Sequence, residues 1–172
     1  MTADELAKHV AEEAARELSD ALGKIAHCVD QLHDAQIWSR PDPALNSIGN
    51  LLLHLTGNLT QWIVCGIGGA ADHRHRAAEF AERGPIPRGD LTRRLEAAVA
   101  GASAALKRSS ASELTRVRLI QGFDVTGLAA IFHSIPHFRG HTQEIVHMTR
   151  RILGDKYRVQ WRPATPEQGA LN

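Results

Sequence analysis

The chain has 172 residues, a length typical of one domain with a single sizeable core. Its formal net charge is +1, with 23% charged residues, so no strong overall field favours nucleic acid or a membrane surface. The sequence has no apolar run long enough to span a membrane, and its first residues, which are acidic and lack an apolar stretch, are not expected to act as a secretory signal. Two cysteines, Cys28 and Cys65, form no disulfide framework, which favours the reducing cytoplasm.

Helical periodicity dominates the first half of the chain. Apolar residues at steps of three and four predict a first helix from residue 2 to about 32, with Leu6 on its apolar stripe. Pro41 and Pro43 break the pattern. Asn46 or Ser47 then caps a second helix that runs to about residue 64. Its predicted stripe is Ile48, Leu51, Leu52, Leu55, Leu59, Trp62 and Ile63.

The second half contains two more predicted helices. Residues 70–89 are polar and are expected to form a long loop with at most one short helix. Asp90 is the predicted cap of a third helix to about residue 107, and residues 114–125 contain a short strand-like piece. A fourth helix spans about Thr126–Leu153, ends at Gly154 and precedes an irregular tail. This pattern predicts one all-α domain over residues 1–172, a four-helix bundle with a long connection between helices two and three.

The predicted fourth helix carries a ladder of histidines, His133, His137 and His141, at successive i, i+4 positions. Such residues share one helix face. Because each residue rises about 1.5 Å, the outer two lie about 12 Å apart, and only an adjacent pair can reach one ion. His137 and His141 are therefore a candidate ligand pair, and Pro136 is expected to bend the helix just before them. A third ligand has to come from another helix.

His54 is the candidate third ligand, because it lies at the edge of the second helix's apolar stripe. A lone histidine in that position is more often a hydrogen-bonded core residue, but the facing pair favours a metal site. His73 and His75 form a competing HxH pattern in the polar loop. Three imidazoles leave one position open on a tetrahedral ion, which is typical of catalytic rather than structural centres.

Metal-bound imidazoles usually donate their other N–H group to a nearby acceptor. Asn58 is spaced to serve His54, and Glu144 is spaced to serve His141. Both residues are equally compatible with an ordinary polar surface. Glu144 is also the candidate catalytic base for metal-dependent hydrolysis, because it is the acidic side chain nearest the pair on that helix.

Three stretches resemble the DinB-like superfamily: NSIGNLLLHLTGNLTQWIVCGIGG (46–69), DHRHRAAEF (72–80), and HFRGHTQEIV (137–146) followed by GDKYR (154–158). The resemblance covers about Leu6–Arg162. It implies a four-helix bundle with a divalent ion, zinc or nickel, on His54, His137 and His141. The family commonly reads HxGQI at the end of the pair, whereas this chain has Gln143 and Glu144 in place of the glycine and glutamine.

The superfamily includes bacillithiol S-transferases and mycothiol-dependent isomerases. The resemblance therefore implies a metal-dependent enzyme, a thiol S-transferase that takes a low-molecular-weight thiol and a small-molecule substrate. In that case Arg74 and Arg76 are candidates for binding an anionic group of either molecule, although loop arginines are more often solvated or dimer contacts. A metal-dependent hydrolase and a non-catalytic, stress-related metal-binding dimer remain alternatives. The resemblance also implies a homodimer, and the near-neutral charge argues against DNA binding.

Overall fold

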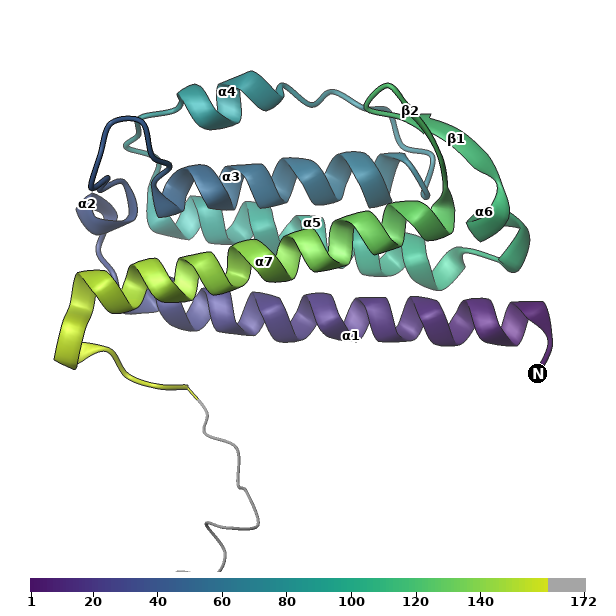
Figure 1. Ribbon diagram of the computed structural model, residues 1–172, viewed down its shortest axis with the longest axis horizontal. Coiled ribbons are helices and arrows are strands. Elements are labelled where there is room, and N and C mark those ends of the chain that lie inside the picture. The colour runs from purple at the N-terminus through teal and green to yellow at the C-terminus, as the bar shows by residue number, and fades with distance from the viewer. Residues whose placement is uncertain (161–172) are drawn as a thin grey trace, which may run out of the picture.

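Four long helices form an all-α bundle in the computed structural model, which describes residues 1–160. They are α1 (Ala3–Asp30), α3 (Ile48–Leu59) with its continuation η1 (Thr60–Cys65), α5 (Arg88–Arg108) and α7 (Gly127–Leu153). In Figure 1, α1 and α7 run side by side beneath α3 and α5. Helices α1 and α3 each pack against both α5 and α7. The predicted bundle is therefore confirmed, and no helix in residues 1–160 is long and apolar enough to cross a membrane.

The core lies between these helices along the predicted stripes. Every residue of the stripe predicted for the second helix is buried, from Ile48 to Ile63. The prediction is wrong at Leu6, whose side chain is 51% exposed. Ala7 and Ala11 hold the buried positions there, because the buried face in the first half of α1 consists of alanines.

Two predicted helix boundaries differ from the structure. The second helix changes to π-helical hydrogen bonding at Thr60, where the Gly66 N–H donates to the Gln61 carbonyl at 3.0 Å. The third helix begins at Arg88 rather than after a cap at Asp90. Pro87 is its N-cap, and the Leu91 N–H donates to the Pro87 carbonyl, so Asp90 lies inside the first turn.

Short elements connect the long helices. They are α2 (Asp34–Ile37), α4 (Arg76–Ala81), α6 (Ala111–Thr115), β1 (Val117–Ile120), β2 (Phe123–Thr126) and η2 (Gly154–Lys156). The strands form the predicted strand-like piece, an antiparallel hairpin that turns at Gln121 and Gly122, both with positive φ. As predicted, α7 ends at Gly154, whose φ is +54°. Of the predicted irregular tail, residues 157–160 are irregular and residues 161–172 lie outside the described part.

The predicted long loop covers the outer side of α3 (Figure 1). We call residues 71–87, which include α4, the α4 segment. Side chains from residues 38–50 hold this segment in place. Trp38 Nε1 donates to the Ile86 carbonyl at 3.0 Å, and Arg40 Nη2 donates to the Glu82 carbonyl at 2.9 Å. The fully buried Asn50 donates to the Glu79 carbonyl at 2.8 Å. The α4 segment is therefore fixed to the helix that carries His54.

Candidate metal centre

His54, His137 and His141 meet between α3 and α7. Their ligand atoms all lie within 4.8 Å of one another, and His54 Nε2 lies 2.9 Å from His137 Nε2. Two nitrogens on one tetrahedral ion, with bonds of about 2.0–2.1 Å, are about 3.3 Å apart. His54 is buried, and the two histidines of α7 are partly exposed. The three imidazoles therefore fit a single divalent ion that is reached from the α7 side.

The far nitrogen of His54 faces a carboxylate that sequence reasoning missed. Glu79 Oε2 lies 3.0 Å from His54 Nδ1. A carboxylate only accepts hydrogen bonds, so it favours the tautomer in which Nδ1 carries the proton and the lone pair of Nε2 faces the centre. Asn58, the predicted partner, makes no side-chain hydrogen bond in the described part of the chain. The only signal for Glu79 was its place in the stretch DHRHRAAEF.

Arg74 holds Glu79 in this position. Its Nε donates to Glu79 Oε1 at 2.7 Å, and its Nη2 donates to Glu79 Oε2 at 2.9 Å. Its Nη1 donates to Gln61 Oε1 at 2.9 Å, on the π-helical turn. Burial by itself would raise the pKa of Glu79, but the hydrogen bonds from Arg74 and His54 hold that pKa below its usual value. The carboxylate therefore stays ionised beside the buried imidazole.

His141 has the acceptor that its spacing predicts. Glu144 Oε2 lies 2.7 Å from His141 Nδ1, one turn further along α7. The side chain of Glu144 is 48% exposed, in contrast to 10% for that of Glu79. The imidazoles of His54 and His141 thus each contact a carboxylate through the nitrogen that points away from the centre. This arrangement leaves both Nε2 atoms free to bind a cation.

His137 completes a triangle of imidazoles, with its ring centroid 5.0 Å from that of His54 and 4.6 Å from that of His141. Burial, followed by the neighbouring charges of His141 and His54, lowers its pKa to about 4. The ring is therefore neutral at physiological pH, which is the form that binds metal. His133, the remaining rung of the ladder, stacks on Trp62 with ring centroids 3.8 Å apart and does not join the cluster of ligand atoms.

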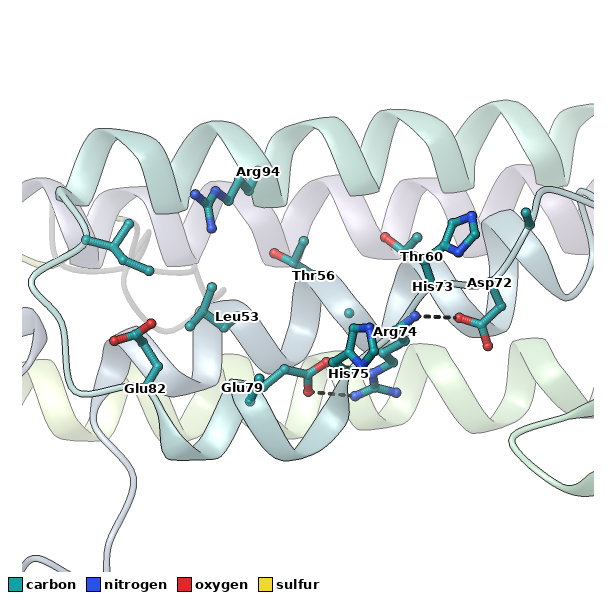
Figure 2. Close-up of a pocket in the computed structure, with 14 residues that line it drawn as sticks. Leu53, Thr56, Thr60, Asp72, His73, Arg74, His75, Glu79, Glu82 and Arg94 are labelled. Carbon is teal, nitrogen blue, oxygen red and sulfur yellow. Dashed lines mark hydrogen bonds and ion pairs between the residues drawn. The ribbon is translucent and has the colours of Figure 1, made fainter.

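The other candidate residues of the loop have separate positions. Arg76 is exposed, and its guanidinium carbon lies 4.9 Å from the centroid of the Phe80 ring, which in turn packs on His54. His73 and His75 do not enter the cluster. Together with Arg74 and Glu79 they line a pocket of about 460 Å³ (Figure 2). The competing HxH pattern therefore forms no three-ligand group in residues 1–160.

One family model matches most of the chain. Residues 5–163 match the model of the family described as "Protein of unknown function (DUF1572)". The chain belongs to this family. No curated protein matches the sequence.

Two solved structures are similar to the chain. The first is a conserved protein from Enterococcus faecalis, with a TM-score of 0.71 and 17% identity over 84% of this chain and 97% of that chain. The second is a DinB-like protein from Bacillus cereus, with a TM-score of 0.63 and 13% identity over 82% of this chain and 91% of that chain. At these identities the likeness shows the fold alone, and the fold of this family member is DinB-like.

Proposed function

We propose that the protein is a metal-dependent enzyme that binds one zinc or nickel ion through His54, His137 and His141. The observation that carries the proposal is the convergence of three imidazoles with no fourth histidine, cysteine or carboxylate among them in residues 1–160. A structural site would be closed by a fourth protein ligand, whereas a catalytic site keeps a position open. Such an ion would act as a Lewis acid and lower the pKa of a bound water or thiol.

The proposed reaction is transfer to a low-molecular-weight thiol. In that reaction the sulfur forms a bond to an electrophilic carbon, the leaving group departs, and the thiol proton is released. Arg76 is the candidate for binding an anionic group of the thiol or substrate, because it is exposed beside Phe80 at the edge of the centre. The guanidinium of Arg74 is committed to Glu79 and Gln61, so its proposed contribution is indirect.

Hydrolysis is the second candidate. It would use the Glu144 carboxylate as the base, and the contact at 2.7 Å places this carboxylate on His141 Nδ1. A carboxylate that is engaged there has to leave the imidazole before it can accept a proton from water. This engagement favours the thiol reaction over hydrolysis.

The first experiment measures metal content. Protein purified without added metal should carry about one divalent ion per chain, which metal analysis by mass spectrometry would identify. His137→Ala should lose this ion. His133→Ala is the matched control, since it removes an imidazole one turn away on the same helix and should leave the stoichiometry unchanged. Full metal content in His137→Ala would refute the site.

The second experiment tests the chemistry. The metal-loaded protein is mixed with a set of low-molecular-weight thiols and a chromogenic aryl halide, and formation of the thioether is followed by absorbance. We expect a rate that depends on the metal and is lost in His137→Ala. Metal-loaded protein that never exceeds the uncatalysed rate with any thiol would count against the transferase and favour the non-catalytic, metal-binding alternative.

A further inference from the structure

The α4 segment contributes one carboxylate to the centre without contributing a ligand. Glu79 contacts His54 Nδ1 from this segment, and the side chains of His54, Arg74 and Glu79 are 6%, 4% and 10% exposed. Water is therefore largely excluded from the contact. A hydrogen bond to a charged acceptor is stronger in such a setting than on the surface.

Two partners of His54 Nδ1 favour opposite tautomers. Glu79 Oε2, at 3.0 Å, needs a proton on Nδ1, whereas Arg74 Nη2, at 3.2 Å, can only donate and needs a lone pair there. The Glu79 contact leaves Nε2 free to bind a cation, and the Arg74 contact does not. The position of the Glu79 carboxylate therefore decides whether His54 is ready to act as a ligand.

A glycine on α3 makes room for this arrangement. A Cβ atom at Gly57 would lie 2.0 Å from Glu79 Oε1 and 2.9 Å from Arg74 Nε. Gly57 lies three residues after His54, so it is on the same side of the helix. Any larger residue at this position has to displace the ion pair from its present position.

We propose that Glu79 is a positioning residue for the metal centre: Arg74 holds its carboxylate on His54 Nδ1 in the space left by Gly57, and this contact raises the affinity for a divalent ion. The inference rests on the proposed metal binding by His54, His137 and His141. By reciprocity, the bound ion strengthens the docking of the α4 segment that carries Glu79. The loop outside the bundle is thus part of the metal centre.

The main test measures Zn²⁺ affinity by competition with a chromophoric chelator. Glu79→Gln keeps the size of the side chain and its acceptor oxygen but removes the charge, and Glu79→Ala removes both. Each should weaken binding by about 10–100-fold, the usual cost of losing a carboxylate behind a metal-bound imidazole. Glu82→Gln is the matched control on the same segment, because within residues 1–160 Glu82 Oε1 accepts only from the nearby Arg83 and Gly84 N–H groups. It should leave the affinity unchanged.

A second variant moves the carboxylate without deleting it. Gly57→Ala should weaken Zn²⁺ binding in the same direction as Glu79→Gln, although alanine is the better helix former. Gly23→Ala is its control, because a Cβ atom there meets nothing within 4 Å and the site is on α1. Both Gly57→Ala and the Glu79 variants are checked for folding by thermal denaturation of the metal-free protein.

Nitrogen NMR of the metal-free protein gives a readout that a purely structural role would not move. The wild-type His54 ring should show a protonated Nδ1, and Glu79→Gln should shift it toward the other tautomer. Zn²⁺ should also slow amide hydrogen exchange in residues 71–87 of the wild type and do so less in Glu79→Gln.

The outcomes separate this inference from the proposed function. Wild-type protein that binds no zinc or nickel would refute the proposed function. Wild-type protein that binds Zn²⁺ while both Glu79 variants and Gly57→Ala bind it as tightly would overturn the positioning role alone. An equal loss of affinity in Glu82→Gln and Glu79→Gln would also overturn it, because the effect would then belong to the segment and not to the carboxylate.

Discussion

His54 Nε2 on α3 lies 2.9 Å from His137 Nε2 on α7, although 83 positions separate the two residues in the sequence. Two ring nitrogens at this distance need either a shared proton or a shared cation. Because Glu79 favours the proton on the far nitrogen of His54, the lone pair of Nε2 points toward His137. A proton on His137 Nε2 would satisfy this pair alone, whereas the proposed divalent ion would take both lone pairs together with that of His141.

The stability of the metal-free protein should depend on pH through His137. Its pKa is lowered from 6.5 to about 4, chiefly by burial, so below pH 6.5 the unfolded chain binds a proton that the folded chain does not. The contribution of His137 to the free energy of unfolding should therefore be fully present above pH 6.5. It should fall by up to about 3 kcal/mol as the pH drops toward 4. Urea denaturation in the presence of a chelator at several pH values measures this slope. His137→Gln should show a shallower slope, and an equal slope would contradict the assignment.

The two carboxylates behind the centre should differ in importance. Glu144→Gln should weaken Zn²⁺ binding less than Glu79→Gln, because the side chain of Glu144 is 48% exposed and water can replace it on His141 Nδ1. Competition titration of both variants under the same conditions makes the comparison. A larger loss of Zn²⁺ affinity in Glu144→Gln than in Glu79→Gln would show that side-chain exposure does not determine which carboxylate matters more. If the protein proves to be a hydrolase and Glu144→Gln keeps the full rate, Glu144 is not its base.

Two helical glycines should respond to alanine in opposite directions. Gly23→Ala should raise the free energy of unfolding by about 0.5–1 kcal/mol, since the position is open and alanine is the better helix former. Gly49→Ala should lower it by about 1–3 kcal/mol, because the new Cβ would lie 2.9 Å from the Trp38 ring, which also anchors the α4 segment. Thermal and chemical denaturation test both, and stabilisation by Gly49→Ala would show that Trp38 moves freely.

We also propose that the protein is a homodimer, in line with the family resemblance. Phe132, near the start of α7, is 69% exposed and lines an apolar groove of about 400 Å³ between α1 and α7. An exposed ring and a groove on the same face suit a two-fold interface, in which the ring of each copy packs into the groove of the other. Analytical ultracentrifugation should find a dimer for the wild type and a monomer for Phe132→Glu. A wild type that stays monomeric at high concentration would refute the dimer.

Local sequence features were enough to predict the long helices and the pair of histidines on α7. The apolar stripe from Ile48 to Ile63 predicts a buried helix face, because helical periodicity depends only on neighbours along the chain. The spacing of His137 and His141 likewise places both rings on one face of α7. The same reasoning failed at Leu6, because the periodicity along α1 does not show which edge of the stripe faces α5 and α7.

The rest of the centre was decided by tertiary structure. The packing of α3 against α7 determines which turn of one helix faces which turn of the other, and thus brings His54 to the pair. Glu79 and Arg74 come from an aperiodic segment whose position depends on Trp38, Arg40 and Asn50. Amino-acid spacing contains the geometry of a helix face, but contacts between distant segments arise only when side chains pack. The sequence by itself therefore determined the bundle and the paired histidines, and only the packed fold decided the carboxylate behind His54 and the partners of Arg74.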